Sequence, residues 1–330
     1  MAFDPTLVRR VSQDPIVAPD SVPGYGPIFN AGLVHHDGRY HLFARAVRNG
    51  YRRNLAGHPR FLDYVSDIVV FTSDDGHRYD FGYVLAQPGP GVEALEDPRV
   101  QWVRSEGATR LVMTYTHMPA PVANKPWRIG AGMLDYDGSR FEVIDATTAL
   151  LGPDGVANKD AVIFNLADGR VALIHRIHPN VQLAVFDSLH DLWTADAAYW
   201  TGYLAALGDH VIIEPTVGAL GVGAGAPPIA TKDGHILFFH EREASGRYTT
   251  KVALLDAVSG RVRGVAADPI LVPELSWERD GDVDNVVFVQ GAHLRSDGSV
   301  YLTYGAADRC VGAATLDLDH VRSHLDIPAA

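Results

Sequence analysis

The fold is decided by the stretch Asn30-Ala-Gly-Leu-Val-His-His-Asp-Gly-Arg-Tyr-His-Leu-Phe-Ala-Arg45, in which an acidic residue and a glycine separate two apolar runs. This pattern is a strong hairpin signal, because the tight turns that join antiparallel strands need positive φ angles. The signature recurs at Glu106-Gly107, Asp168-Gly169, Asp233-Gly234 and Asp297-Gly298. From glycine to glycine the steps are 69, 62, 65 and 64 residues, so five hairpin units fill most of the 330 residues.

A β-repeat of this length is typical of a propeller, because one blade buries too little surface alone and must pack on its neighbours. The sequence therefore predicts an all-β protein, a five-bladed β-propeller that forms a single domain over residues 1–330. Helical periodicity is nearly absent, and residues 188–196 and 316–325 are expected to form at most short turns. Residues 14–19 repeat the outer-edge segment 268–273 of the fourth unit. We expect this N-terminal segment to complete the last blade and close the ring.

The composition restricts the cellular setting and the partners. The single cysteine, Cys310, excludes an internal disulfide and suits a reducing compartment. The first 15 residues do not resemble a signal peptide, and no run approaches the ~18 apolar residues of a membrane span. With 40 acidic and 28 basic residues, the net charge of −12 argues against nucleic acid as the main partner. We expect a cytoplasmic protein with neither a nucleic-acid nor a membrane partner.

Polar residues recur at one end of the predicted hairpins. In an antiparallel pair, the start of the first strand and the end of the second strand lie at the same end. The residues at these positions are Asn30, Arg45, Asp97, Arg99, Tyr115, Lys159, Asp160, Arg176, His240, Glu241, Asn285 and Tyr304. We expect a closed ring to gather them at one rim of its central channel, where they would form a functional site.

The segment Glu96-Asp97-Pro98-Arg99 carries the sharpest signal at this rim. A proline at the head of a strand is tolerated, and it would fix the backbone so that Asp97 projects from the rim. Asp97 is then either a catalytic carboxylate steered by nearby cations or one partner of an ion pair with Arg99 between blades.

Four basic residues occupy equivalent rim positions and favour an anion site. Arginine binds phosphate or carboxylate through two parallel hydrogen bonds, and lysine acts as a point charge. These residues are Arg45, Lys159, Arg176 and His240. No metal site is predicted, because adjacent histidines such as His35 and His36 point to opposite faces of a strand.

At these residues the chain resembles glycoside hydrolase family 130, the five-bladed mannoside phosphorylases and related β-mannosidases, over nearly its whole length. The motifs that carry the resemblance are Phe29-Asn30, Leu42-Phe-Ala-Arg45, Glu96-Asp-Pro-Arg99, Asn158-Lys-Asp-Ala-Val162, Ile174-His-Arg176, Gly223-Ala-Gly-Ala-Pro-Pro-Ile229, Phe239-His240, Asn285-Val-Val-Phe288 and Tyr304-Gly-Ala-Ala-Asp308.

The resemblance implies an inverting phosphorolysis of β-mannosides that releases α-mannose 1-phosphate. Asp97 matches the family's catalytic acid, whose proton is relayed through the 3-hydroxyl group of the bound mannosyl unit. The positions that match sugar-binding residues are Asn30, Arg45, Lys159, Asp160 and Asp308. Glu96, Arg99 and Tyr115, which flank Asp97 or share its rim, complete the expected substrate-binding set. The phosphate-binding set is Arg176, His240 and Tyr248, which would hold phosphate on the face opposite the acid. The implied partners are a β-mannoside oligosaccharide and phosphate as co-substrate, with no cofactor and no metal; a homo-oligomer remains open.

The sequence departs from the family pattern in ways that keep alternatives open. Where the family has a short acidic turn and then a strand that starts with Ser-Arg, this chain has a long basic stretch and then Ser66-Asp67. Asp67 cannot supply the positive charge of that arginine, and Arg48, Arg52 or Arg53 are the candidates to replace it. His240 is followed by Glu241-Arg242-Glu243, and Glu241 or Glu243 acting on a water molecule would make the protein an inverting β-mannosidase. A third hypothesis is a catalytically silent propeller that only binds glycans or a protein. The acceptor sugar is expected to depend on the loops at residues 48–64 and 118–127.

Overall fold

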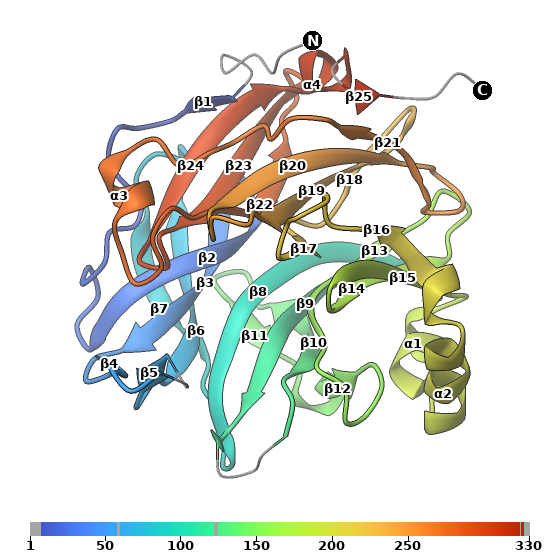
Figure 1. The fold of residues 1–330 in the computed structure, drawn as a ribbon, viewed down its shortest axis with the longest axis horizontal. Helices are drawn as coiled ribbons and strands as arrows, with labels where there is room; N and C mark the ends of the chain where they lie inside the picture. The colour runs from blue at the N-terminus through green and yellow to red at the C-terminus, as the bar shows by residue number, and fades with distance from the viewer. Residues whose placement is uncertain (1–7, 58–59, 122–124, 324, 327–330) are drawn as a thin grey trace.

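The structure is a computed structural model that describes residues 8–57, 60–121, 125–323 and 325–326. The protein is all-β, with antiparallel hairpins that follow one another along the chain (Figure 1). All five hairpins predicted from the acidic-glycine turns are present. Within the described residues, no helix has the length and apolar character needed to cross a membrane.

The first two units share one nine-stranded sheet, joined by a single parallel pairing of Ser66 with Ala94. The strands of the first unit are β2 (Tyr25–His36), β3 (Arg39–Arg48), β6 (Ser66–Ser73) and β7 (Asp80–Ala86). Those of the second are β8 (Val92–Ser105), β9 (Ala108–Pro119), β10 (Arg128–Tyr136), β11 (Phe141–Val143) and β12 (Ala149–Leu151), with the short 3-10 helix η2 (Asp145–Thr147) before β12. A small hairpin, β4 (Arg52–Arg53) with β5 (Phe61–Leu62), projects from the connection between β3 and β6.

The remaining three units are separate antiparallel sheets. The third contains β13 (Lys159–Asn165), β14 (Val171–Ile177), β15 (Asn180–Phe186) and β16 (Val211–Ile213). The fourth contains β17 (Gly221–Ala224), β18 (Ile229–Thr231), β19 (Gly234–Arg242), β20 (Tyr248–Leu255) and β21 (Val262–Ala266), with β25 (Leu325–Asp326) at its edge. The fifth contains β22 (Val287–Leu294), β23 (Ser299–Ala306) and β24 (Cys310–Asp317).

Each unit packs against the next one in the chain, and the fifth packs against the first. Strand β2 contacts β8, β8 contacts β13, β13 and β14 contact β17, and β19 and β20 contact β22. Strand β22 in turn contacts β2. Buried apolar side chains fill these interfaces; Leu42 of the first unit and Tyr301 and Val311 of the fifth belong to one such cluster. A single unit could not bury this apolar surface alone, so each unit is stabilised by its neighbours.

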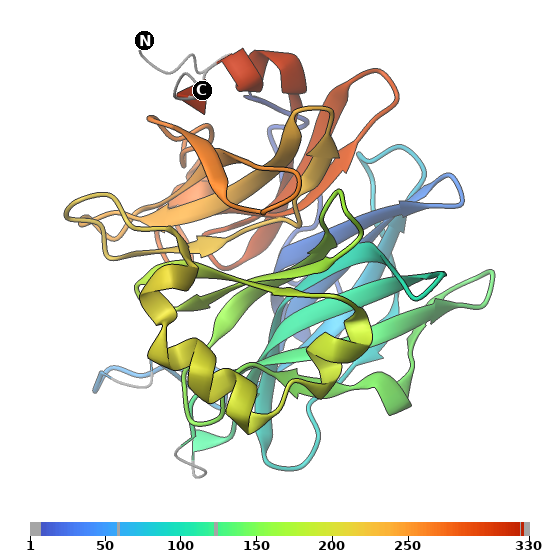
Figure 2. The same ribbon diagram turned by 90° about the vertical axis from the view of Figure 1, so that its right-hand side faces the viewer.

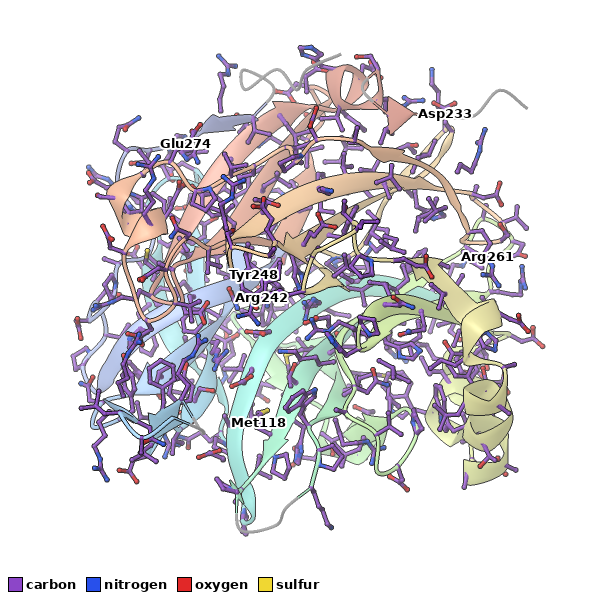
Figure 3. The ribbon with its side chains drawn as sticks, in the orientation of Figure 1. Met118, Asp233, Arg242, Tyr248, Arg261 and Glu274 are labelled. Carbon is purple, nitrogen blue, oxygen red and sulfur yellow. The ribbon has the colours of Figure 1, made fainter. Side chains whose placement is uncertain are left out.

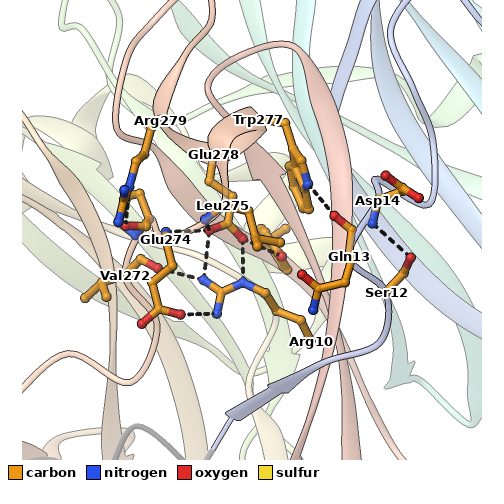
Figure 4. Close-up of polar contacts among 12 residues, drawn as sticks. Arg10, Ser12, Gln13, Asp14, Val272, Glu274, Leu275, Trp277, Glu278 and Arg279 are labelled. Carbon is orange, nitrogen blue, oxygen red and sulfur yellow. Dashed lines mark hydrogen bonds and ion pairs between the residues drawn. The ribbon is translucent and has the colours of Figure 1, made fainter.

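The N-terminal strand β1 (Val8–Arg10) is the outer strand of the fifth sheet, where it pairs antiparallel with β24. This strand lies upstream of the predicted segment 14–19, which contributes only an isolated bridge between Val17 and Val311. Arg10 anchors the strand through hydrogen bonds to the carboxylate of Glu278 at 2.7 and 2.8 Å (Figure 4). It also reaches the Glu274 carboxylate at 2.6 Å and the Val272 carbonyl at 2.8 Å.

Helices are more extensive than the sequence predicted. In the third unit, α1 (Leu189–Thr194), α2 (Ala197–Ala205) and the 3-10 helix η3 (Leu207–His210) lie on the outside of the sheet (Figure 2). Ser188 and Asp196 accept hydrogen bonds from backbone N–H groups at the starts of α1 and α2, as N-cap residues do. The short helices α3 (Ser276–Arg279) and α4 (Leu318–Ser323) flank the fifth unit.

A repeated β-bulge interrupts the first strands of three units. The register shifts between Phe29 and Gly32, between Glu96 and Arg99, and between Lys159 and Val162. At each shift one residue adopts a positive φ: 48° at Asn30, 52° at Asp97 and 55° at Asp160. A bulge turns a side chain away from the ladder direction. The same position in successive units thus aims a polar side chain inward.

Candidate active site

A cavity of about 150 Å³ is lined by polar residues from all five units. Ten of its lining residues were predicted as site residues: Asn30, Arg45, Glu96, Asp97, Lys159, Asp160, Arg176, His240, Tyr248 and Asp308. They are separated by up to 278 positions in the sequence, so the packing of the units is what brings them together.

Four of these residues hold a strained backbone. The φ angles of Asn30, Asp97 and Asp160 lie in the left-handed region, and that of Asp308, in the turn between β23 and β24, is 53°. Such a conformation costs a non-glycine residue on the order of 1–3 kcal/mol, although Asn and Asp tolerate it best. Strain repeated at the wall of one cavity points to a functional constraint on where these side chains are aimed.

Asp97 lies in a dense network of charge. Its carboxylate accepts a hydrogen bond from Asn30 Nδ2 at 2.8 Å and one from Arg45 at 3.3 Å. Arg45 also bonds Glu96 at 2.5 Å and the Tyr64 hydroxyl at 2.9 Å. Burial raises the pKa of Asp97, but nearby cations, chiefly Arg45, outweigh it and hold that pKa below its usual range. Asp97 is therefore ionised in the free protein.

The pKa values of Glu96 and Asp308 are shifted in the opposite direction, upward. Burial raises the pKa of Glu96, and the charge of Asp97 adds to this effect against the opposition of Arg45. Burial raises the pKa of Asp308 to about 7, where Arg45 opposes the shift and Asp97 and Glu96 support it. The cavity thus retains a proton on its carboxylates near neutral pH.

The predicted phosphate set surrounds Asp160. Arg176 Nε lies 3.0 Å from Asp160 Oδ2, and His240 Nε2 lies 3.7 Å from the same oxygen. Burial lowers the pKa of His240 to about 3 despite the opposing charge of Asp160, so this imidazole is neutral and acts as a hydrogen-bonding group rather than a cation. Its ring centroid is 6.0 Å from that of Tyr248, whose pKa burial raises, so the phenol stays protonated.

Several buried polar atoms of this wall lack a hydrogen-bond partner within the described residues. They are Asn30 Oδ1, Arg45 Nε and His240 Nδ1. Buried polar groups are nearly always paired, so each unpaired atom calls for an explanation. A ligand rich in hydroxyl groups would satisfy them.

Glycine is required behind this wall, where the backbone comes close to functional side chains. A Cβ atom at Gly223 would collide with Asp160 and His240, and one at Gly305 would collide with Asn30. The segment Gly221–Ala224 forms strand β17, which pairs with β19. The absence of a side chain at Gly223 leaves room for Asp160 and His240.

Two predicted substrate-binding residues lie behind the cavity rather than in its described lining. Arg99 is buried and donates hydrogen bonds to the carbonyls of Ala224 and Gly225, both at 2.8 Å, and to Asp160 at 3.3 Å. It ties the second, third and fourth units together and positions Asp160. Tyr115 packs its ring over Gly130 on the neighbouring strand. The side chains of Arg99 and Tyr115 thus lie outside the described lining of the cavity.

The two candidate bases, Glu241 and Glu243, are also absent from the described lining. Glu241 accepts hydrogen bonds from Lys251 Nζ at 2.9 Å and from the Thr216 N–H at 2.8 Å. Glu243 pairs with Arg247 through bonds of 2.8 and 3.0 Å. Because neighbouring residues of a strand face opposite sides, His240 facing the cavity requires that Glu241 face away.

The same alternation identifies a residue that the sequence analysis missed. Arg242 lies two positions after His240 on β19 and lines the cavity beside Tyr248 (Figure 3). Arg60, also missed, reaches the cavity from the loop that carries β4 and β5. The proposed substitutes do not: Arg48 forms a two-bond pair with Asp67, at 2.8 and 3.0 Å, and Arg53 bonds the Asp282 carbonyl.

The chain is similar in sequence and in fold to known mannoside phosphorylases. Residues 7–326 match the sequence profile of a family described as beta-1,4-mannooligosaccharide phosphorylase. A 1,2-beta-oligomannan phosphorylase of Thermoanaerobacter sp. (strain X514) is 28% identical, over 96% of this chain and 99% of the relative. A solved beta-1,2-mannobiose phosphorylase from Listeria innocua, in complex with beta-1,2-mannobiose, has a TM-score of 0.73 at 19% identity and covers 97% of this chain and 99% of its own. The chain belongs to glycoside hydrolase family 130, the family of mannoside phosphorylases.

Proposed function

We propose that this protein is an inverting β-mannoside phosphorylase, which uses inorganic phosphate to release α-mannose 1-phosphate from a β-mannoside oligosaccharide. One observation carries the proposal: Asp97 and the group formed by Arg176, His240 and Tyr248 line the same 150 Å³ cavity. An acid and an anion-binding group in one cavity are the two parts that such a displacement needs. The reaction requires no metal and no cofactor.

In the proposed reaction, a phosphate oxygen attacks C1 of the mannosyl unit from the face opposite the leaving sugar. The bond between C1 and the glycosidic oxygen breaks, and that oxygen takes a proton that originates on Asp97 and passes through the 3-hydroxyl group of the mannosyl unit. Arg176 offsets the charge of the phosphate, and His240 and Tyr248 donate hydrogen bonds to it. Attack from the opposite face inverts the configuration at C1.

Asp97 has a low pKa in the free protein, so it can donate a proton only if substrate binding raises that pKa. A phosphate bound beside Arg176 and Lys159 adds negative charge and offsets those cations, which raises the pKa of a neighbouring carboxyl group. Asp308, whose pKa burial raises to about 7, lines the same cavity and provides a local source of the proton. Acid catalysis is thus coupled to the arrival of phosphate.

We also infer that the five units are the blades of one five-bladed propeller domain, and that β1 completes the fifth blade. The contact of each unit with the next, and of the fifth with the first, supports this inference. The pairing of β1 with β24 supports the closing role of the N-terminal segment.

Phosphorolysis is favoured over hydrolysis by the positions of the acidic residues after His240. Glu241 is held by Lys251 and Thr216, and Glu243 by Arg247, so neither is free to activate a water molecule in the cavity. A solved relative with a TM-score of 0.69 at 20% identity, covering 94% of each chain, is described in work on family members that hydrolyse beta-1,2 mannosidic linkages in Candida mannan. Hydrolysis is therefore the alternative to be tested.

The test is to incubate the purified protein with β-1,2- and β-1,4-mannobiose in the presence and absence of phosphate. We expect α-mannose 1-phosphate to form in a phosphate-dependent reaction. Release of free mannose at the same rate without phosphate would establish the hydrolase instead. No turnover of either disaccharide under both conditions would favour a protein that only binds glycans.

A further inference from the structure

A second, larger cavity of about 660 Å³ adjoins the catalytic cavity, and Arg60, Arg242 and Val283 line both. This outer cavity is also lined by Glu243, Arg247 and Asp284. Asp97 and the proposed phosphate set belong to the inner cavity alone. The outer cavity is therefore where the leaving sugar, or the unit attached to it, would lie.

The two arginines at the junction have no carboxylate partner among the described residues. Elsewhere on the outer wall, Arg247 is paired with Glu243. Asp284, whose carboxylate accepts a hydrogen bond from the Gly281 N–H at 3.3 Å, offsets one of the two remaining positive charges, so the charged side chains of the wall leave a net positive charge. In a protein of net charge −12, two unpaired guanidinium groups that face one space form a local positive site. A neutral sugar does not require such a site.

Arg242 is held in place before any ligand arrives. Its guanidinium carbon lies 5.6 Å from the centre of the Tyr248 ring, and its Nε atom is buried without a hydrogen-bond partner. Figure 3 shows the two side chains next to each other in the middle of the molecule. Stacking restricts the side chain, so less conformational entropy is lost when it binds an anion.

Arg60 belongs to the loop that carries β4 and β5, and this loop is docked on the other wall of the outer cavity. The Tyr51 hydroxyl bonds Asp282 at 2.5 Å, and Arg53 bonds the Asp282 carbonyl at 2.7 Å. These contacts place the loop beside the segment that contributes Val283 and Asp284. The arginine therefore enters the site on a supported segment.

We propose that the outer cavity binds an anionic group, a carboxylate or a phosphate, that is carried by the leaving sugar and held between Arg60 and Arg242. The proposal rests on the proposed function, which supplies the leaving sugar. Guanidinium groups bind both anions through paired hydrogen bonds, so the shared chemistry is that of an oxyanion with at least two oxygens. The preferred substrate is then a β-mannoside with an acidic leaving sugar, and neutral mannooligosaccharides are turned over less efficiently.

The first test is a ligand-binding titration that needs no turnover. Glucuronate and glucose form a matched pair, because they differ only in a carboxylate in place of a hydroxymethyl group. We expect the wild-type protein to bind glucuronate roughly ten- to hundredfold more tightly than glucose, the effect of one or two charge-assisted contacts. In Arg60→Gln and in Arg242→Gln this ratio falls toward one. Arg52→Gln, an exposed change on the same hairpin, retains it.

The same titration with inorganic phosphate distinguishes the two sources of the anion. Arginine variants that weaken phosphate binding and leave glucuronate affinity unchanged would assign both residues to the phosphate site and overturn the proposal. Equal wild-type affinity for glucuronate and glucose would overturn it as well. Arg60→Gln lies in an exposed loop and does not depend on the Tyr248 stacking, so a folding defect in the Arg242 variant leaves the test intact.

The second test measures synthesis from α-mannose 1-phosphate with glucuronate, glucose 6-phosphate and glucose as acceptors. We expect the two anionic acceptors to be preferred by kcat/KM, and the preference to be lost in the arginine variants. A preference for glucose would overturn the proposal. If no acceptor reacts, the proposed phosphorylase activity fails, while the binding titration still decides whether the anion site exists.

Discussion

Asp308 lies in the turn between β23 and β24, where burial, supported by the charges of Asp97 and Glu96, opposes its ionisation. Its pKa of about 7 in the folded protein compares with an ordinary value of 3.8. Between these pH values, the folded protein keeps a proton that the unfolded chain has released. The free energy of unfolding therefore falls as the pH rises through this range.

Asp308→Asn should remove this part of the pH dependence. The variant and the wild type carry the same charge at this position near pH 5, whereas at pH 8 only the wild type carries a buried carboxylate. We expect the variant to gain stability relative to the wild type between pH 5 and pH 8 in denaturant titrations. Asp135→Asn, an exposed change on β10, is the control and should leave the pH profile unchanged. If the free energy of unfolding changes with pH in the same way for the wild type and Asp308→Asn, the raised pKa of Asp308 is contradicted.

The repeated bulge uses a strained backbone to aim polar side chains at the cavity. The left-handed backbone at Asp97 disfavours any residue with a Cβ atom by roughly 1–2 kcal/mol relative to glycine. Asp97→Gly should therefore unfold at a higher denaturant concentration than Asp97→Ala, although both lack the proposed acid and should be inactive. At Asp135, which lies in regular strand, the order should reverse, with alanine more stable than glycine by about 0.5–1 kcal/mol. If the alanine variant is more stable than the glycine variant at Asp97 as well as at Asp135, the bulge stores no strain.

The hairpins were predictable because each turn is encoded locally, by an acidic residue and a glycine between apolar runs. The bulges were not, because a register shift depends on pairing with a distant strand. Helix α2 was missed because its sequence, from Ala197 to Ala205, contains tyrosine, threonine and glycine without a clear helical period. The N-terminal strand was expected at residues 14–19, where the sequence repeats, but it forms at Val8–Arg10, where Arg10 finds buried partners.

Seven of the ten predicted residues that line the cavity follow from their positions at hairpin ends, whereas Tyr248 and Asp308 follow only from the family resemblance. The direction of a side chain was often not predicted. Strand alternation alone would have turned Glu241 away from the site and brought Arg242 into it, given that His240 faces inward. Arg60 gives no such signal, because its place depends on how a long loop docks. The hairpin ends near the cavity were therefore easier to predict from the sequence than the side chains that enter it.

Arg10 anchors the first strand of the chain to the connection between the fourth and fifth units. Its partner Glu278 is fully buried and also accepts a hydrogen bond from the Glu274 N–H at 2.7 Å (Figure 4). The Tyr304 hydroxyl donates a further hydrogen bond to Glu278 at 2.8 Å. Removing one partner of a buried ion pair leaves the other charge uncompensated, at a cost of roughly 3–5 kcal/mol.

Arg10→Ala should lower the free energy of unfolding by about that amount, as measured by denaturant titration. Arg9→Ala, an exposed change on the same strand, should have little effect. Adding Glu278→Gln to Arg10→Ala should recover part of the loss, because it removes the unpaired charge. Equal stability of the Arg9 and Arg10 variants would show that the N-terminal strand is not anchored in this way.

The central claim is that units distant in sequence bring an acid and a phosphate site to one sugar-binding cavity. A crystal structure with mannose and phosphate bound tests it most directly. We predict a phosphate in contact with Arg176, His240 and Tyr248, and a mannose ring whose 3-hydroxyl group lies within hydrogen-bonding distance of Asp97. Phosphate bound away from these three residues, or a mannose ring that does not reach Asp97, would contradict the account.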